Sequence, residues 1–159
     1  MNGDAQMFKK ICLIAALTGI SATVFADETP ALPYGLSFSG TAALTSDYRY
    51  RGMTQTFNDP SVQAGFVLSH ESGAYAGVWG SNVDFGGTAH IELDPYIGYA
   101  TTLDNFAHKP LLDVGLWYYA YPSESDLNWL ELYGKLTFND VLVPGASLLT
   151  AVNYTNDFL

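Results

Sequence analysis

Charged side chains recur at alternate positions along several otherwise apolar stretches of this sequence. Successive side chains of a β-strand project to opposite faces, so residues two apart share a face. On that basis the charged residues lie opposite apolar neighbours and form one acid-rich wall with a local basic cluster, which favours small cations or zwitterions over anions. The members of this wall are Asp47, Arg49, Arg51, Asp84, His90, Glu92, Asp94, Asp113, Glu131 and Lys135.

Three residues of this wall, His90, Glu92 and Asp94, have side chains that bind metals in other proteins. Alternate residues of a strand are separated by about 7 Å, because each residue advances the strand by about 3.3 Å. One ion could be held by all three only with help from neighbouring strands. The pattern therefore favours polar side chains paired across strands over a metal site, and we predict no cofactor.

Catalytic chemistry has little support in the sequence. A hydrolase needs a nucleophile beside a histidine that a third group orients. The histidines are His70, His90 and His108, and although Ser69 adjoins His70, adjacent strand residues point to opposite faces. The sequence contains no G-x-S-x-G, H-E-x-x-H or P-loop motif, so we predict that the protein is not an enzyme.

The stretch Leu36 to Arg51 shows the alternation most clearly, with apolar residues at even positions and hydroxyls or charges at most odd ones. It is longer than the five or six residues of an ordinary strand, whereas a tilted strand that crosses a bilayer needs about 9–11. Six more alternating stretches follow, and none has a sustained helical period. They cover residues 61–70, 74–85, 89–101, 111–121, 129–138 and 146–154.

Details of these strands lead to further predictions. In residues 74–85 the large residues Tyr75 and Trp79 are assigned to the apolar face, opposite Asp84. Pro95 lacks a backbone donor and predicts a bulge or an unpaired position. Glu71 to Gly73 predicts a tight hairpin turn.

The N-terminal residues 1–26 have the features of a secretory signal peptide. Lys9 and Lys10 precede the apolar run Ile11 to Ile20, and Val24-Phe25-Ala26 is typical of a cleavage site. A membrane-anchoring helix is the weaker alternative, because spanning needs about 18 apolar residues. The chain's single cysteine, Cys12, lies inside this segment, so we predict an exported protein without disulfides.

Composition narrows the class of the remaining residues. The net charge of −10 makes the chain a poor partner for nucleic acid. Many aromatic residues, alternation in place of long apolar runs, and export are together typical of a bacterial outer-membrane β-barrel. We predict one all-β domain over residues 27–159, an antiparallel up-and-down transmembrane barrel in contact with outer-membrane lipids and delivered by the barrel-assembly machinery. Bacterial single-chain barrels have even strand numbers, so seven strands predict a truncated chain.

Three segments together resemble the TorF family, a proteobacterial family of porin-type outer-membrane proteins. They are SDYRYRGMTQT at 46–56, SGAYAGVWGSNVDFG at 72–86 and ELDPYIGY at 92–99. The resemblance spans nearly all of the chain after the leader and is looser around Trp129 to Lys135. It implies an outer-membrane barrel of porin type, with no established catalytic residues to transfer.

The function expected from these observations is passive passage of small hydrophilic solutes or ions. A non-conducting structural or adhesion barrel, in which the wall charges pair and close the lumen, is the first alternative. A soluble periplasmic ligand-binding β-barrel, with the apolar face inward, is the second. Similarly, Asp47, Arg49 and Arg51 either filter solutes or pair structurally, with Tyr48 and Tyr50 in an interfacial aromatic girdle.

Overall fold

The computed structural model describes residues 21–25, 32–139 and 145–155, and most of these residues are in β-strands. The strands of the main sheet are β1 (Ser21–Phe25), β2 (Leu36–Thr45), β5 (Ser61–His70), β6 (Ala74–Asn82), β7 (Ile91–Thr102), β8 (Leu111–Tyr119), β9 (Trp129–Asn139) and β10 (Ser147–Thr155). A small separate pair is formed by β3 (Arg49–Tyr50) and β4 (Met53–Thr54), and two short 3₁₀ turns are η2 (Pro33–Gly35) and η3 (Ser125–Leu127). None of the described segments is a helix with the length and apolarity needed to cross a membrane.

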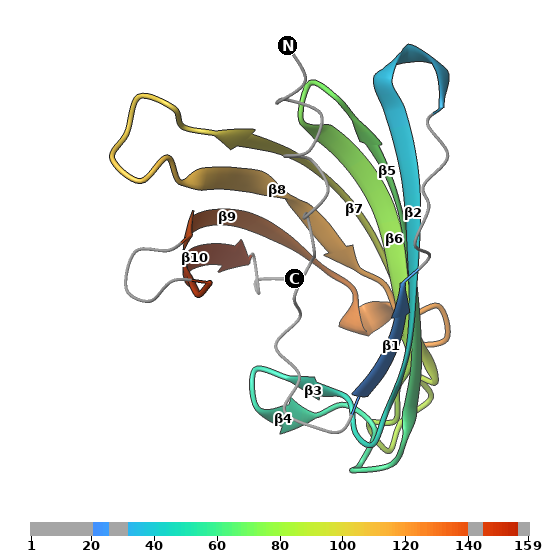
Figure 1. The fold of residues 1–159 in the computed structure, drawn as a ribbon. Helices are drawn as coiled ribbons and strands as arrows, with labels where there is room; N and C mark the ends of the chain where they lie inside the picture. Colours follow the sequence, from blue (N-terminus) through green and yellow to red (C-terminus); the bar gives the residue numbers. More distant parts are fainter. Residues whose placement is uncertain (1–20, 26–31, 140–144, 156–159) are drawn as a thin grey trace.

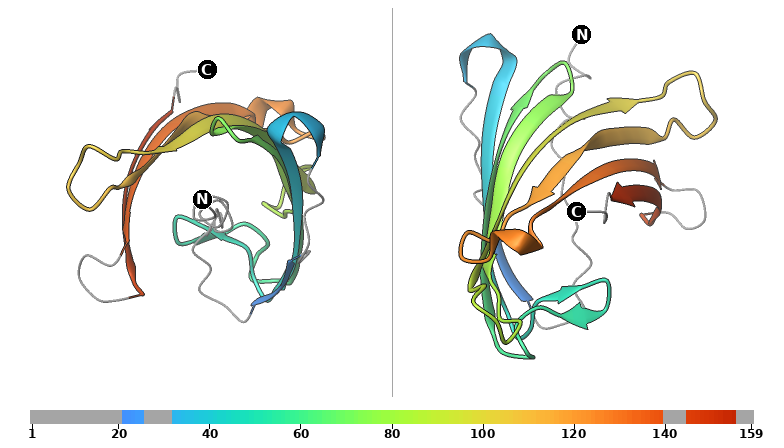
Figure 2. Two further views of the ribbon diagram at one scale, coloured as in Figure 1. Left: turned by 45° about the horizontal axis from the view of Figure 1, so that its top comes forward. Right: turned by 180° about the vertical axis from the view of Figure 1, so that it is seen from behind.

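The main sheet is antiparallel, and its spatial order β1-β2-β5-β6-β7-β8-β9-β10 follows the chain. The seven strands expected from alternation correspond to β2 and β5 to β10, so the all-β class and the up-and-down order are confirmed. The sheet curves into an arc with a concave and a convex side, and β1 and β10 stand at its two ends (Figures 1 and 2). In the described residues these two edge strands pair with β2 and β9 respectively and not with each other.

The strand β1 was not expected, because its residues belong to the segment that the sequence assigns to the signal peptide. It pairs with β2 from Ser21 opposite Thr45 to Phe25 opposite Thr41. The rest of that segment, including the basic and apolar parts of the predicted leader, lies outside the described residues.

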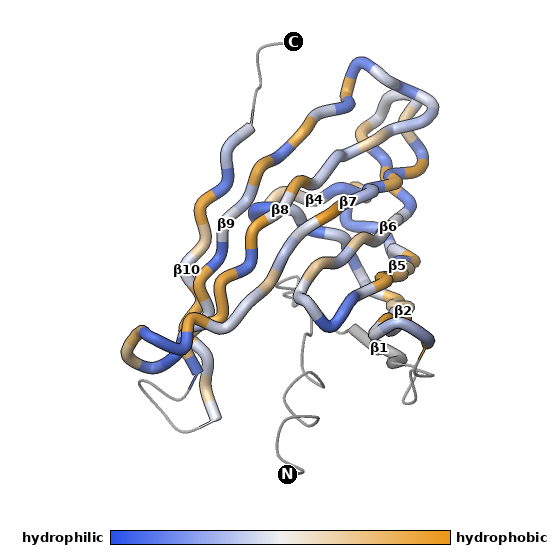
Figure 3. Tube along the Cα trace, turned by 90° about the horizontal axis from the view of Figure 1, so that it is seen from above, coloured by the Kyte–Doolittle hydropathy of each residue, from blue (hydrophilic) through white to orange (hydrophobic). Residues whose placement is uncertain are grey.

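Polar and apolar residues alternate along the long strands, which Figure 3 shows as alternating colours on β7, β8 and β9. On β7 the even-numbered residues Glu92, Asp94 and Tyr96 are buried, whereas the odd-numbered Leu93 and Ile97 are exposed. The buried set faces the concave side, where side chains from different strands contact one another. Exposed apolar residues cover the convex side, among them Phe38, Leu44, Val62, Phe66, Leu68, Val78, Val114, Leu116, Leu130, Leu132 and Val152.

The β5–β6 connection forms the tight turn that the sequence predicts. Gly73 has a φ of 101°, a conformation that a side chain disfavours. Its amide donates to the carbonyl of His70, and its carbonyl accepts from the Ala100 amide of β7. A Cβ at this position would collide with the Ala100 carbonyl oxygen, which explains the glycine. The tight turn predicted at Glu71 to Gly73 is confirmed by the hydrogen bond from the Gly73 amide to the His70 carbonyl.

Pro95 interrupts the pairing of β7 on one side only. Pro95 is opposite Val78 in the β6–β7 ladder. In the ladder with β8, regular pairing begins at Tyr96, and Leu93 forms an isolated bridge to Ala120. The unpaired position predicted at Pro95 is therefore present, and the strand continues through it.

The first long strand is shorter than alternation predicts. It ends at Thr45, and the chain then forms a hairpin, here called the inner hairpin (residues 46–60), which contains β3 and β4. Figure 2 shows this hairpin inside the arc of the sheet. At its tip Arg51 and Gly52 have φ values of 48° and 86°, which reverse the chain and end the extended conformation.

Candidate functional site

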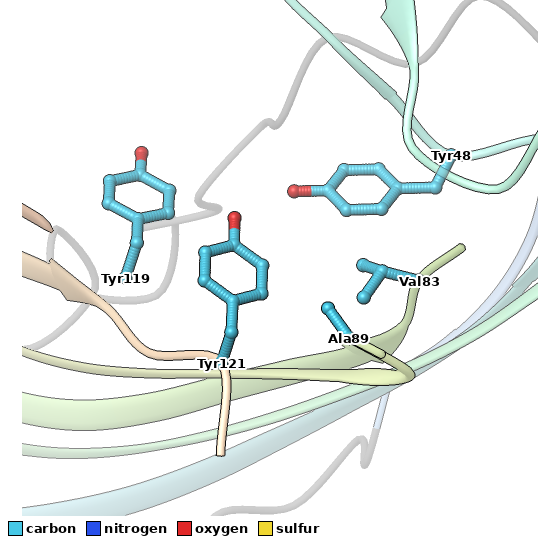
Figure 4. Close-up of a cluster of buried hydrophobic side chains, with 5 residues drawn as sticks. All are labelled: Tyr48, Val83, Ala89, Tyr119 and Tyr121. Atoms are coloured by element: carbon cyan, nitrogen blue, oxygen red, sulfur yellow. The ribbon is translucent and has the colours of Figure 1, made fainter. Parts of the chain in front are cut away.

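The inner hairpin contacts the concave face through Tyr48. This side chain is only 8% exposed, and its ring meets Trp79 edge-on at a centroid distance of 5.3 Å. Its hydroxyl donates to Oε1 of Glu92 at 3.4 Å. Burial, and then the negative charge of Glu92, raise the pKa of the Tyr48 phenol. In Figure 4 the hydroxyl end of Tyr48 points toward Tyr121, which comes from the connection between β8 and β9.

A second contact holds the hairpin tip to β9. Nη2 of Arg51 lies 2.5 Å from Oε2 of Glu131, and the Tyr50 hydroxyl donates to the same oxygen at 3.4 Å. The Tyr50 ring is edge-on to Tyr119 and Trp129, at centroid distances of 5.7 and 6.2 Å. The expectation that Tyr48 and Tyr50 belong to an outer aromatic girdle is wrong, because both pack against the concave face.

The base of the hairpin is closed by Asp47. Nε of Arg49 lies 2.7 Å from its Oδ2, and the hydroxyls of Thr54 and Thr56 donate to Oδ1 at 2.6 and 3.1 Å. The Thr54 hydrogen bond, which is the largest effect, lowers the pKa of the Asp47 carboxyl, and the Thr56 hydrogen bond and the charge of Arg49 add to it; burial, the second-largest effect, opposes them. The predicted ion pair between Asp47 and Arg49 is present, and the choice between a structural and a filtering role for these residues stays a prediction.

Two acids on β7 lie deep in the concave wall, beneath the inner hairpin. Glu92 and Asp94 are each 1% exposed. Nε1 of Trp117 donates to Oδ2 of Asp94 at 3.0 Å. Oε2 of Glu92 and Oδ1 of Asp94 have no hydrogen-bond partner, and no basic side chain of the described residues forms an ion pair with either acid. Both oxygens are buried away from solvent, and a proton held between the two neighbouring carboxyl groups is what can satisfy them.

A third charged pair lies further along β8 and β9, away from the inner hairpin. Asp113 and Lys135 are opposite in the strand register, and Nζ of Lys135 is 4.0 Å from Oδ2 of Asp113. The Tyr75 hydroxyl from β6 donates to Oδ1 of Asp113. Lys135 also lies over the ring of Tyr133, 4.3 Å from its centroid. The predicted placement of both charges on the polar face is confirmed.

Two predicted wall residues lie elsewhere. Asp84 is exposed beyond the end of β6, where its Oδ1 accepts from the Gly86 amide at 2.8 Å. His90 is also exposed and precedes β7. On β6 it is Tyr75 and Trp79 that face the concave side, so the faces of that strand are the reverse of the predicted ones. The physical reason is that tyrosine and tryptophan combine an apolar ring with a polar end, so their size does not identify the apolar face.

The aromatic character of the concave wall was not foreseen. Tyr96 stacks on Trp117 at 4.4 Å, and Tyr119 stacks on Trp129 at 3.8 Å, with rings within 6° of parallel. Glycines on neighbouring strands make room for such rings, since a Cβ on Gly77 would collide with the Tyr96 ring. On β7 and β8, Gly98 and Gly115 share the parity of Asp94 and Asp113, and such glycines on a polar face are the sequence signal for aromatic rings that lie across it.

In the described part of the chain, no side chains are arranged as a metal site or as a catalytic site. No group of three or more His, Cys, Asp or Glu side chains is placed there to hold a metal ion. Nδ1 of His70 lies 2.8 Å from the Ser72 hydroxyl, but this pair sits on an exposed turn, and no acid among the described hydrogen bonds orients the imidazole. The arrangement lacks the third member that a nucleophile and base require.

A comparison with family models matches residues 27–154 to a family described as a bacterial protein of unknown function (Gcw_chp). The chain belongs to this family. No curated protein and no solved structure matches it. The family description assigns no activity, so function has to be argued from the arrangement of residues described above.

Proposed function

We propose that this protein is an outer-membrane β-barrel through which small hydrophilic solutes pass passively, with a preference for cations or zwitterions. The single observation that carries the proposal is the reversed distribution of its side chains. Charged residues such as Glu92, Asp94 and Glu131 are buried on the concave side, while large apolar residues are exposed on the convex side.

This distribution suits a protein surrounded by lipid. A water-soluble sheet turns its apolar face toward a core, as the soluble ligand-binding alternative requires. Here Val62 and Ile97 are 66% and 57% exposed, and they belong to a continuous convex band of such residues. Placing charge on that band instead would cost roughly 2–4 kcal/mol for a lysine or arginine at the bilayer midplane.

Three further observations support an outer-membrane location. The predicted signal peptide implies export, and the three segments that resemble the TorF family imply a porin-type barrel. Strands of nine to twelve residues in β2 and β5 to β10 match the length of tilted membrane strands. Membrane insertion further requires that both edges of the sheet be paired, since lipid cannot satisfy backbone donors and acceptors. Cleavage of the predicted signal peptide removes β1 and leaves β2 as an edge, so we propose that additional pairing at β2 and β10 closes the barrel.

The inner hairpin sets the size of the proposed pathway. Its contacts with Glu92 and Glu131 place it against the concave wall, so the solute path runs between the hairpin and the remaining wall. The same hairpin also favours the second candidate, a non-conducting structural or adhesion barrel, because it occupies interior space and neutralises Glu131 with Arg51.

Conductance in planar lipid bilayers tests the choice between these candidates. The full-length protein, folded in detergent and shown to be a barrel by its heat-modifiable electrophoretic migration, should give discrete conductance steps with a reversal potential that favours cations. A heat-modifiable protein that never gives steps would leave only the non-conducting barrel. Full solubility without detergent would contradict both candidates.

The double variant Arg49→Gln/Arg51→Gln tests whether the hairpin filters ions. If its two arginines face the pathway, their removal should increase the cation preference measured as the reversal potential in a salt gradient. Lys109→Gln is the matched control, because Lys109 pairs with Asp104 in an exposed loop. Equal reversal potentials in all three proteins would show that the arginines only hold the hairpin in place.

A further inference from the structure

A pocket of about 410 Å³ opens at the end of the sheet that carries the inner hairpin. Because the strands are antiparallel neighbours, the connections β2–β5, β6–β7 and β8–β9 all lie at this end. The β6–β7 connection and the segment that leads through η3 into β9 build the pocket. Its lining residues are Phe85, Gly87, Tyr121, Glu124, Leu127 and Trp129.

The only charged residue of this lining, Glu124, is held in place by the opposite connection. Its Oε2 accepts hydrogen bonds from the amides of Thr88 and Ala89, at 2.9 and 3.0 Å, and from the Thr88 hydroxyl at 3.1 Å. The amide of Thr88, followed by its hydroxyl, lowers the pKa of the Glu124 carboxyl. These donors all reach the same oxygen, so the charge is fixed in position while Oε1 remains available.

Gly87 allows this close approach of the two connections. A Cβ at residue 87 would lie 2.8 Å from Oε2 of Glu124, closer than real Cβ contacts occur. Any larger residue would therefore push the carboxylate away from the Thr88 and Ala89 amides. The negative edge of the pocket thus depends on backbone packing as well as on the acid itself.

Three aromatic side chains, those of Phe85, Tyr121 and Trp129, line the pocket beside Glu124. Phe85 and Tyr121 meet edge-on at a centroid distance of 5.6 Å and an angle of 69°. Trp129 is braced by its stack on Tyr119, with centroids 3.8 Å apart. Aromatic rings attract cations through the negative potential of their faces, and rigid rings next to a carboxylate are the arrangement that recognises quaternary ammonium groups.

We propose that this pocket, the Phe85–Glu124 pocket, binds a small organic cation that carries a quaternary ammonium group. An anion would be repelled by Glu124. A trimethylammonium group donates no N–H bond, so apolar rings and one fixed negative charge satisfy it.

Binding at this position also gives the proposed permeation route a substrate class. The pocket lies at the hairpin end of the concave wall, and the acids Glu92 and Asp94 lie further inside. Capture of the cation before it enters the lumen rests on the proposed function; binding itself does not. The experiment therefore measures binding separately from conductance.

Isothermal titration of the folded full-length protein in detergent, with choline chloride as the probe, tests the proposal. Choline should bind saturably, and its neutral isostere 3,3-dimethyl-1-butanol should bind at least about tenfold more weakly, because it keeps the shape and loses the charge. Sodium chloride at equal ionic strength is the control for general screening. Absence of saturable choline binding, or equal binding of the isostere, overturns the proposal.

Two variants locate the binding. Glu124→Gln keeps an acceptor for the Thr88 and Ala89 amides, and Phe85→Leu keeps apolar bulk, so each should weaken choline about three- to tenfold while the heat-modifiable migration is retained. Asp126→Asn removes the same charge from an exposed residue two positions away and should bind choline like the unaltered protein. Equal loss in Asp126→Asn, or no loss in the other two, places the binding elsewhere and overturns the proposal.

Binding of choline without any conductance would overturn the permeation role of the protein and leave the binding pocket standing.

Discussion

Two groups of buried acids on the same concave wall differ in how their charge is balanced. Glu131 on β9 pairs with Arg51 and accepts a further bond at Oε1 from Nδ2 of Asn153 at 2.8 Å. Glu92 and Asp94 on β7 have no basic partner among the described residues: Glu92 accepts from the Tyr48 hydroxyl, Asp94 accepts from the Trp117 ring nitrogen, and the two carboxyl groups lie within hydrogen-bonding reach of each other.

This difference means that Glu131 stabilises the fold, whereas burying Glu92 and Asp94 lowers the free energy of unfolding. A buried carboxylate that is paired and hydrogen-bonded can offset the loss of its hydration, whereas one without a cation cannot. Glu131 therefore anchors the inner hairpin to the wall. Glu92 and Asp94 have no cation beside them in the described part of the chain, and two neighbouring buried carboxyl groups without one hold a proton between them. As a pair they add at most one negative charge to the interior, and the proposed cation preference rests on that charge.

Removing the partner of the balanced acid should have the largest effect. Arg51→Gln leaves Glu131, which is 4% exposed, without its cation, and we expect the free energy of unfolding to fall by about 2 kcal/mol. Denaturant titration in detergent micelles measures this loss. The double variant Arg51→Gln/Glu131→Gln should recover at least half of it, because the stranded charge is then gone. Strictly additive losses would mean that the two residues do not interact.

Neutralising the unbalanced acids should act in the opposite direction and by less. Glu92→Gln/Asp94→Asn keeps acceptors for Tyr48 and Trp117 while removing the buried charge of the pair, so the free energy of unfolding should rise by about 1 kcal/mol. The same titration applies, with Asp104→Asn in an exposed loop as the control. A decrease in stability would show that the two acids are balanced in the folded protein and would remove the contrast with Glu131.

The smallest expected effect concerns the hairpin base and its pH dependence. The pKa of Asp47 is lowered in the folded protein, first by the Thr54 hydrogen bond, so its ionised form stabilises the fold above the ordinary value of 3.8. This contribution should disappear as pH falls through the lowered pKa. Unfolding measured from pH 6 to pH 2 should therefore show a shallower acid-induced loss for Asp47→Asn than for the unaltered protein. Parallel curves would show that the Asp47 hydrogen bonds do not contribute.

How far the fold could be predicted depended on how strongly local sequence specifies each part. Alternation predicted all seven strands from β2 to β10 of the main sheet, because a period of two has one geometric meaning in an extended chain. It failed after Thr45, where the alternating pattern continues to Arg51. There the hydroxyls of Thr54 and Thr56 bind Asp47, and these contacts within the hairpin outcompete extension of the strand.

The charged wall was also predicted only in part, and local sequence again decided which part. Glu92, Asp94 and Glu131 were placed correctly on the concave side, since apolar neighbours flank each of them. Asp84 was placed incorrectly, because Tyr75 and Trp79 have both an apolar body and a polar end and so suit either face. Which acid pairs with Arg51 could not be predicted, as residues 51 and 131 are eighty positions apart.

The sequence by itself determined the all-β class, the order of the long strands and the separation of a polar from an apolar face, because each of these follows from the spacing of residues along one strand. Only the tertiary structure decided that the SDYRYRG segment turns back onto the concave wall, that Arg51 balances Glu131 and not Glu92, and that Phe85, Tyr121 and Trp129 meet beside Glu124. These contacts join residues from different connections and strands, and their distances are set by the register and curvature of the whole sheet.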